Sequence, residues 1–259
     1  MIWRLLLALA MTGCLADVFL LHPPEPDRKH AELRRTIADR DGAIEVFVAA
    51  SVPGTEPQAY MLCFFGNGEV AGDPVVELAQ WMPPLSIELW GVNYPGYGGS
   101  EGTPSLDGVA RAARVAYRAI AARANGKPII VFGSSLGATA ALHVAAHERL
   151  AGIVLHNPPP LRRLILCRYG WWNLWLVALP MALQIPHALD ATANAARSKA
   201  PALFISSSDD GVVPFGYQER VMKAYAGDWK LLENRGAGHN TPIPAWITSA
   251  LAKTIATWL

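Results

Sequence analysis

The stretch "IIVFGSSLGATAALHVAA", from Ile129 to Ala146, decides the fold of this chain. Its first four residues, Ile129–Phe132, are β-prone and predict a short buried strand, and from Ala138 onward small and apolar residues continue at helical spacing. Ser135 lies between these two elements, with a glycine two positions away on each side. Glycine relieves crowding at such a junction because it has no Cβ. The pattern therefore predicts that Ser135 is exposed on a strained turn between a strand and a helix.

Strand-like and helix-like runs alternate on both sides of this turn. The strand-like runs are Ile44–Val48, Tyr60–Phe65, Ile87–Asn93, Ile129–Phe132, Gly152–Leu155, Ala202–Ser206 and Trp229–Leu232. The helical runs are Leu106–Ala124, Leu136–His147, Tyr217–Tyr225 and Ala245–Leu259. Several of the strands are apolar throughout, as expected when helices cover both faces of a parallel sheet. We predict a doubly wound, mostly parallel α/β domain over residues 31–259.

Composition sets limits on the class of protein. The chain has 259 residues, of which 52% are hydrophobic and 17% are charged, which supports a large core and argues against disorder. The formal net charge of +1 makes nucleic acid an unexpected partner. Cys14, Cys63 and Cys167 form neither a metal-binding pattern nor a disulfide framework, and Cys63 is expected to be a buried small hydrophobe. We expect no cofactor and no metal.

The N-terminal stretch "MIWRLLLALAMTGC", which ends at Cys14, has the layout of a secretory signal. Its last four residues resemble the bacterial lipobox, in which the cysteine becomes the lipidated first residue, although Met11 stands where leucine is usual. This reading predicts an exported lipoprotein of the cell envelope, or an exported soluble protein.

An uncleaved membrane anchor is the alternative interpretation of the same region. The run Leu5–Leu21 is close to the shortest length that spans a bilayer, and Asp17 makes such a span unfavourable. Under both interpretations we expect residues 1–21 to lie outside the fold, followed by a proline-rich linker over His22–His30.

One segment interrupts the alternation of strands and helices. Over forty residues separate the strand that ends near Leu155 from the one that begins at Ala202, and a crossover of this length is usually functional. Residues 160–197 are predicted to form a helical insertion. It could pack on the core, cap a pocket with apolar side chains that meet an acyl or aromatic substrate, or rest on a membrane surface. The side chains for the membrane interpretation are Trp171, Trp172, Trp175, Arg162, Arg163 and Arg168.

A serine hydroxyl is a poor nucleophile until a base removes its proton. In a strand–turn–helix context, the partners of a G-x-S-x-G serine follow in the order acid and then histidine. The segment "FISSSDDGVVP" places Asp209 and Asp210 just after a strand, and "ENRGAGHNTP" places His239 in a loop after the last strand. Both aspartates are candidates for the acid.

Two further stretches complete a resemblance to a known family. They are "FFGNGE" (Phe64–Glu69) and "YPGYGGSEGTPS" (Tyr94–Ser105). With the serine, acid and histidine motifs, the chain resembles the serine hydrolases of the α/β-hydrolase superfamily over roughly residues 60–245. It is most similar to compact, often membrane-anchored members with an HGN-type loop and a YPGYGxSxGxPS loop. Phe65 is a departure, because that loop usually has a histidine there.

The resemblance implies a role for each motif residue. Ser135 is the expected nucleophile, His239 the base, and Asp210, which precedes "GVVP", the acid, with Asp209 as the alternative. The expected oxyanion hole consists of the backbone N–H groups of Leu136 and Asn67.

Other polar residues are interpreted as structural. Ser134 lacks the symmetric flanking glycines, and "YPGYGGSEG" fails the phosphate-binding pattern at Glu101, so it is read as a tight turn beside the pocket. The remaining histidines considered are assigned surface, strand-end or pocket-lining positions: His143, His147, His156 and His187.

The sequence thus predicts hydrolysis of a carboxylic ester, or of a thioester, with a hydrophobic acyl or aryl group through an acyl-serine intermediate. The partner would be a small ester or lipid-like molecule, with a membrane surface near the N-terminus. An acyltransferase or peptidase could use the same three side chains, because fold does not decide the acyl acceptor. A non-catalytic envelope lipoprotein is the third hypothesis.

Overall fold

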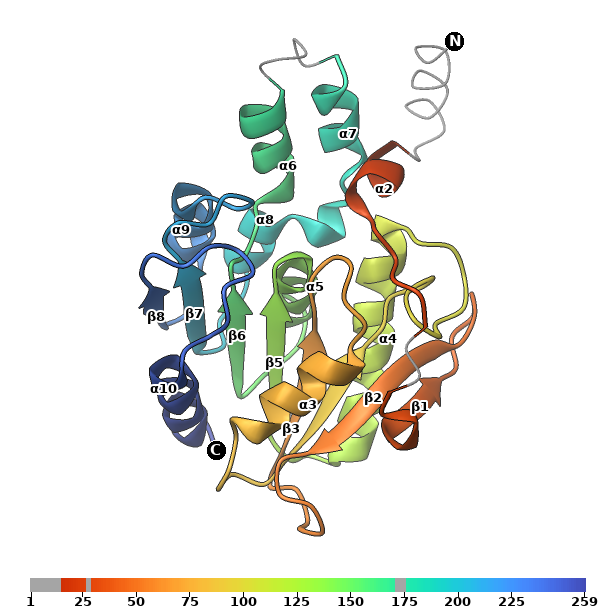
Figure 1. Cartoon of the computed structure of the whole chain (residues 1–259), viewed down its shortest axis with the longest axis vertical. Coiled ribbons are helices and arrows are strands. Elements are labelled where there is room, and N and C mark those ends of the chain that lie inside the picture. The colour runs from red at the N-terminus through yellow and green to blue at the C-terminus, as the bar shows by residue number, and fades with distance from the viewer. Residues whose placement is uncertain (1–14, 27–28, 171–175) are drawn as a thin grey trace.

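The computed structural model describes residues 15–26, 29–170 and 176–259. Within them, an eight-stranded sheet has the order β1-β2-β4-β3-β5-β6-β7-β8 (Figure 1). β2 pairs antiparallel with β1 and β4, and all other neighbouring strands are parallel. The strands are β1 (Arg34–Ile37), β2 (Ile44–Ala50), β3 (Ala59–Phe64), β4 (Ile87–Val92), β5 (Ile129–Ser134), β6 (Gly152–His156), β7 (Ala202–Ser207) and β8 (Trp229–Asn234).

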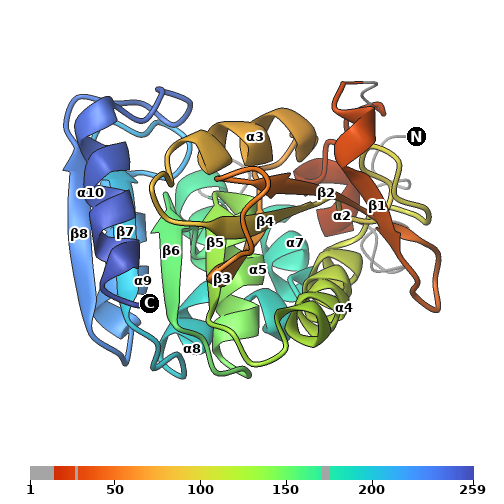
Figure 2. The same ribbon diagram turned by 90° about the horizontal axis from the view of Figure 1, so that it is seen from below.

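Helices cover both faces of the sheet, as seen from below in Figure 2. One face carries α3 (Gly72–Gln80) and α10 (Ala245–Ala256), and the other carries α4 (Leu106–Ala124), α5 (Leu136–Ala145), α8 (Ala191–Ala195) and α9 (Phe215–Ala224). Side chains of β5 alternate between the two cores, as those of a strand must. Ile130 and Phe132 pack on the α3 and α10 side, and Val131 packs on the α4 and α5 side.

The predicted fold class is confirmed, and each predicted strand and helix overlaps an observed one. Two elements were not expected. β1 is a four-residue edge strand with two arginines, and charged edge strands lack the apolar pattern by which strands are detected. α3 begins with Gly72, Asp73 and Pro74, a sequence typical of a turn, although proline is also accommodated in the first turn of a helix.

The expectation that residues 1–21 lie outside the fold is wrong for residues 15–21. α2 (Leu15–Leu20) packs on the domain, with Leu15 1% exposed, and Leu21 beyond it is 5% exposed. Asp17 accepts a hydrogen bond from the Leu106 N–H at 2.8 Å, so it helps to cap α4. Burial raises the pKa of the Asp17 carboxyl. The lipobox, including Cys14, lies outside the described residues.

The predicted linker over residues 22–30 is also more closely packed than expected. Pro24 accepts a hydrogen bond from the Gly98 N–H at 3.2 Å, and the His22 N–H donates to the Asn67 side chain at 2.9 Å. The start of this segment therefore belongs to the domain. A search of the described residues for a helix long and apolar enough to cross a membrane found none.

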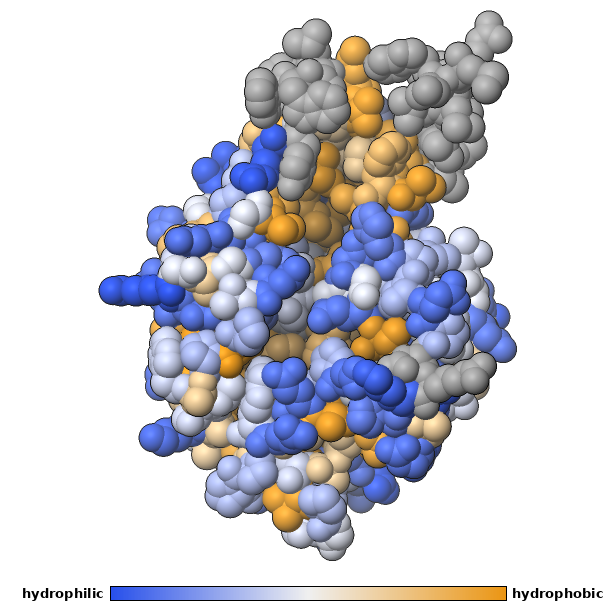
Figure 3. Space-filling view, viewed as in Figure 1, coloured by the Kyte–Doolittle hydropathy of each residue, from blue (hydrophilic) through white to orange (hydrophobic). Residues whose placement is uncertain are grey.

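The crossover forms helices that stand at one end of the molecule beside α2 (Figure 1). These are α6 (Leu161–Leu164), the π-helical turn η2 (Ile165–Tyr169), α7 (Ala178–Gln184) and the short η4 (His187–Leu189). Apolar side chains gather on this end in Figure 3. The exposed ones on α2 and around α7 are Val18, Phe19, Leu176, Leu179 and Leu183. Trp171, Trp172 and Trp175 lie outside the described residues.

Candidate active site

The turn between β5 and α5 holds Ser135 in a conformation that L-residues rarely adopt, with φ 51° and ψ −120°. Both flanking glycines are required by close packing. A Cβ on Gly133 would lie 2.5 Å from the Gly137 carbonyl oxygen, and a Cβ on Gly137 would collide with the carbonyl of Phe64. The strained backbone presents the Ser135 side chain at the carboxyl edge of the sheet, where open α/β sheets bind ligands.

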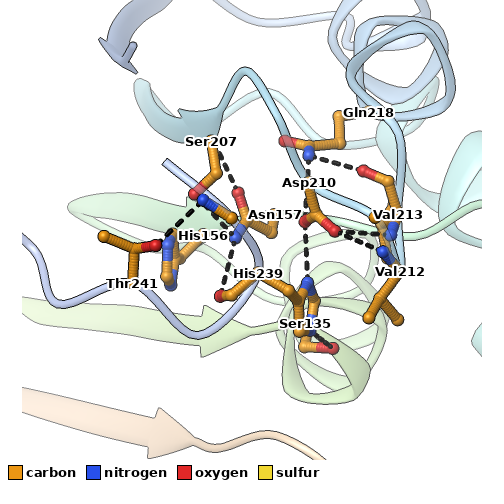
Figure 4. Close-up of polar contacts among 12 residues, drawn as sticks. Ser135, His156, Asn157, Ser207, Asp210, Val212, Val213, Gln218, His239 and Thr241 are labelled. Atoms are coloured by element: carbon orange, nitrogen blue, oxygen red, sulfur yellow. Dashed lines mark hydrogen bonds and ion pairs between the residues drawn. The ribbon is translucent and has the colours of Figure 1, made fainter. Parts of the chain in front are cut away.

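Three side chains that are distant in sequence meet at this edge (Figure 4). The Ser135 hydroxyl lies 3.0 Å from Nε2 of His239, and Nδ1 of His239 lies 2.7 Å from Oδ2 of Asp210. A carboxylate only accepts hydrogen bonds, so the proton lies on Nδ1 and Nε2 is free to accept from the serine. This is the arrangement of a nucleophile, a base and an orienting acid.

Asp210 is held by a set of hydrogen-bond donors. Its side chain is 0% exposed, and Oδ1 accepts from the N–H groups of Val212 and Val213 at 2.8 and 2.7 Å. Oδ2 accepts from Nε2 of Gln218 at 3.3 Å in addition to His239. Asp209 is exposed and accepts instead from the Ser208 hydroxyl. Of the two candidate acids, the structure brings Asp210 to His239.

The loop after β3 approaches the serine closely. A Cβ built on Gly66 would lie 3.7 Å from the Cβ of Ser135. The Gly66 N–H itself is occupied, because it donates to Glu69 at 2.5 Å. The N–H groups of Asn67 and Leu136 have no hydrogen-bond partner among the described residues. Leu136 begins α5, so its N–H also lies in the positive field of a helix N-terminus.

Phe65, which replaces the usual histidine of this loop, is 5% exposed and packs against Phe132, with ring centroids 6.0 Å apart. Its carbonyl accepts a hydrogen bond from the Tyr94 hydroxyl at 2.9 Å. The loop is therefore fixed by its backbone and by apolar packing at the position where a polar side chain was expected.

A second serine and histidine lie next to the first pair. The Ser134 hydroxyl is 3.1 Å from Nδ1 of His156, in the parallel register of β5 and β6. Burial, followed by the charge of His239, lowers the pKa of His156 to about 4, so this ring stays neutral near pH 7. Its Nε2 has no hydrogen-bond partner in the part of the chain that the structure describes. The strand-end position expected for His156 agrees with this placement.

A cavity of about 710 Å³ opens beside Ser135. Its apolar lining comes from the loop after β3, from α3 and its C-terminal end, from β5, and from the loops before α9 and α10. Its polar lining includes Glu69, Glu77, His156 and Asn240. The apolar members are Phe65, Leu78, Trp81, Phe132, Val212 and Ile243. No described residue of the crossover lines this cavity. The expectation that residues 160–197 supply the apolar wall around the substrate is therefore not met by the part of the crossover that is described.

Comparisons with known proteins agree with this geometry. The family described as "Serine aminopeptidase, S33" matches residues 55–183. An esterase of Pyrococcus furiosus superposes with a TM-score of 0.69, 14% identity, 92% of this chain and 99% of that chain covered. The protein has the α/β-hydrolase fold. The matches together support a place in the α/β-hydrolase superfamily and support a hydrolase.

Two further similarities agree with the α/β-hydrolase fold. Est1E from Butyrivibrio proteoclasticus, in a structure with bound ferulic acid, has a TM-score of 0.68 and 14% identity, and 86% of this chain and 98% of that chain are covered. An uncharacterized protein of Mycobacterium tuberculosis is 31% identical over 194 residues, which span 73% of this chain and 65% of that protein. The chain thus matches somewhat less than two thirds of that relative.

Several residues around the candidate site were not expected from the sequence. Asn157, at φ 47°, accepts from the Ser207 N–H at 2.8 Å and donates to the His239 carbonyl at 3.5 Å, which ties the histidine loop to β6 and β7. Gln218 reaches Asp210 from α9. An asparagine directly after a predicted strand was the available signal for the first, whereas Gln218 has no sequence signal.

Proposed function

We propose that this protein is a serine hydrolase that cleaves carboxylic esters, or thioesters, with a hydrophobic acyl or aryl group. The observation that carries the proposal is the continuous hydrogen-bond chain from the Ser135 hydroxyl through His239 to the buried Asp210 carboxylate. It is supported by the aromatic and aliphatic lining of the adjacent cavity. Est1E, which is bound to the aromatic acid ferulic acid in its structure, offers a precedent for an aryl group in the same fold.

In the proposed reaction, Ser135 Oγ attacks the substrate carbonyl carbon while its proton passes to Nε2 of His239. Asp210 stabilises the imidazolium that forms, and the N–H groups of Leu136 and Asn67 donate to the oxyanion. The imidazolium protonates the leaving alcohol or thiol, which departs and leaves an acyl-serine. His239 then removes a proton from water, which attacks the acyl group and releases the acid and the free serine.

Labelling with a fluorophosphonate probe, followed by mapping of the modified residue, tests this proposal. We expect label on Ser135 and hydrolysis of short and medium-chain p-nitrophenyl esters. Absence of both label and turnover would contradict the proposed hydrolase activity and favour a non-catalytic envelope lipoprotein. Label on Ser134 would reassign the nucleophile.

A peptidase that uses the same side chains is the second candidate, because the matching family is described as a serine aminopeptidase. Glu69 and Glu77 line the cavity, and a carboxylate is the group that pairs with the free ammonium of a peptide substrate. Turnover of aminoacyl p-nitroanilides in preference to esters would select this function.

We also propose that the N-terminal end attaches the protein to a membrane of the cell envelope. The support is the lipobox-like "MTGC" ending at Cys14 in the sequence, together with exposed apolar side chains on the neighbouring helices α2 and α7, among them Phe19 and Leu183. We expect Cys14→Ser to move the protein from the membrane to the soluble fraction. Unchanged membrane association would contradict lipidation and favour an uncleaved anchor.

A further inference from the structure

The Asn67 side chain is held by a segment that lies 45 residues earlier in the chain. Its amide Nδ2 donates to the Leu20 carbonyl at 2.7 Å and to Nδ1 of His22 at 2.7 Å. Its Oδ1 accepts from the His22 N–H at 2.9 Å and from the Tyr97 hydroxyl at 2.7 Å. A primary amide has two donors and two acceptor positions, so this side chain is fully hydrogen-bonded. Residue 67 nonetheless lines the cavity beside Ser135.

The segment that makes these contacts is itself anchored to the domain at several points. Ala16 is 1% exposed and donates its N–H to Gln184 of α7 at 2.8 Å, and Asp17 accepts from the first N–H of α4. Residues 15–22, which we name the N-terminal strap, are therefore anchored before they cross the β3 loop, and Pro24, just after the strap, accepts a hydrogen bond from the Gly98 N–H at 3.2 Å. Tyr97 adds a donor from a third segment, and burial raises the pKa of its hydroxyl to about 12, so the hydroxyl keeps its proton at neutral pH.

We propose that the N-terminal strap completes the oxyanion hole by positioning Asn67. The four hydrogen bonds orient the side chain away from the reacting carbonyl and fix the backbone of residue 67, so that its N–H is directed to the developing negative charge. The strap thereby replaces the loop histidine, whose place is taken here by the buried Phe65. Asn67 acts through its backbone, and His22 and Tyr97 are positioning residues. The inference rests on the proposed ester hydrolysis.

The physical basis is preorganisation. A donor stabilises an oxyanion fully only when it is held at hydrogen-bond distance from the position of that oxygen before reaction, and loss of one such donor lowers kcat by about 10²–10³-fold. Loss of the hydrogen bonds that anchor the Asn67 side chain, with its backbone N–H retained, should lower kcat by only part of this factor. The ground-state substrate gains little from the same donor, so KM should change much less than kcat.

Asn67→Ala is the central test, because it keeps the backbone N–H and removes all four anchoring hydrogen bonds. We expect kcat for a p-nitrophenyl ester to fall about 10–100-fold, with KM within about threefold of the parent. His22→Ala and Tyr97→Phe each leave part of the anchor and should lower kcat by about 3–10-fold. Matched controls are His147→Ala in the exposed turn after α5 and Tyr117→Phe on α4, for which kcat should stay within about twofold.

A transition-state analogue separates positioning from a merely structural role. A trifluoromethyl ketone adds to Ser135 and forms an oxyanion, whereas the carboxylic acid product binds without forming one. In Asn67→Ala we expect the affinity for the ketone to fall by the same factor as kcat, with the affinity for the product acid unchanged. Once Asn67 is alanine, adding His22→Ala should lower kcat no further, because the two act through one network.

Two results would overturn the proposal while the proposed function stands. One is a parent-like kcat in Asn67→Ala, and the other is equal loss of affinity for ketone and product acid. Both are interpretable only if the parent protein is labelled at Ser135, and failure of that labelling contradicts the proposed function itself. If Asn67→Ala does not fold, His22→Ala and Tyr97→Phe carry the same test, since they leave the loop sequence intact.

Discussion

Ser134 and Ser135 are neighbours in the chain, and each hydroxyl lies about one hydrogen bond from a histidine, at 3.1 and 3.0 Å. The surroundings of the two pairs differ. Ser135 lies on a strained turn at a helix N-terminus, and the far nitrogen of its histidine meets a buried carboxylate. Ser134 ends a regular strand, and its histidine has no carboxylate partner among the described residues.

From this difference we expect that only Ser135 acts as a nucleophile, although both serines lie close to a histidine. A base works best when its pKa is near the working pH, and burial lowers the pKa of His156 to about 4, which makes it a weak acceptor for a serine proton. Neutral His156 beside Ser134 is better suited to fill the cavity wall. Three predictions test this division, in order of decreasing effect.

The largest effect is expected from Ser135→Ala, which removes the nucleophile. We expect ester turnover to fall by at least about 10⁴-fold, and His239→Ala should lose a similar factor because the members of a triad act as a unit. Ser134→Ala is the matched control, with turnover within about tenfold of the parent. Steady-state kinetics on a p-nitrophenyl ester provide the measurement. Equal loss in both serine variants would remove the distinction between the two pairs.

A somewhat smaller loss is expected from Asp210→Asn. The amide cannot hold the His239 proton on Nδ1 as the carboxylate does, so kcat should fall about 10³–10⁴-fold. Asp209→Asn, one residue away and exposed, should leave kcat within about twofold. Circular dichroism of both variants checks that the fold is retained. A large loss in Asp209→Asn with little in Asp210→Asn would reassign the acid.

The smallest effect on activity, and a distinct effect on stability, is expected for His156. In the native state the pKa of this ring is about 4, whereas in the unfolded chain the ring has its ordinary pKa of about 6.5. The unfolded state therefore binds more protons in this window, and the free energy of unfolding decreases as the pH falls from about 6.5 to about 4, by about 3 kcal/mol for this residue. Above pH 6.5 this contribution is fully present.

Urea unfolding of the parent and His156→Gln at several pH values between 7 and about 4 measures this contribution. The variant should show a shallower loss of stability with acid, and the other titrating groups cancel in the comparison. An unchanged slope in His156→Gln would contradict a neutral, buried role.

Much of the fold followed from the sequence because strongly patterned segments form what their pattern predicts. Several of the parallel strands, such as β3 and β5, are apolar almost throughout, and α4 begins and ends where its periodicity does. Elements that lack such a pattern were not predicted. β1 carries its arginines at the sheet edge, and α2 lies within an apolar run that predicts a leader or an anchor instead of a packed helix.

The candidate site likewise contains residues that occur in recognisable sequence motifs and residues that do not. Ser135, His239 and the pair of aspartates occur in short motifs after strands, so their convergence could be predicted, and the choice of Asp210 rested on family resemblance. His22 and Asn157 act through contacts 45 and 82 residues away, and nothing in a local pattern encodes such contacts. The cavity also lies on the α3 side of the sheet. Side chains at the end of a β-strand alternate between the two faces, so the position of a residue in its strand determines whether it can line the cavity.

Asp17 determines where the domain begins. An acidic residue is unfavourable within an apolar leader, but here its carboxylate accepts a hydrogen bond from the first N–H group of a nineteen-residue helix of the domain. Recombinant protein trimmed to begin at His22 would lose the buried Leu15 and Leu21 and would leave α4 without its hydrogen bond to Asp17. Preparations that start at Leu15 keep the buried side chains of α2 and the contact of Asp17 with α4. We expect them to be the better starting material for crystals and for assays.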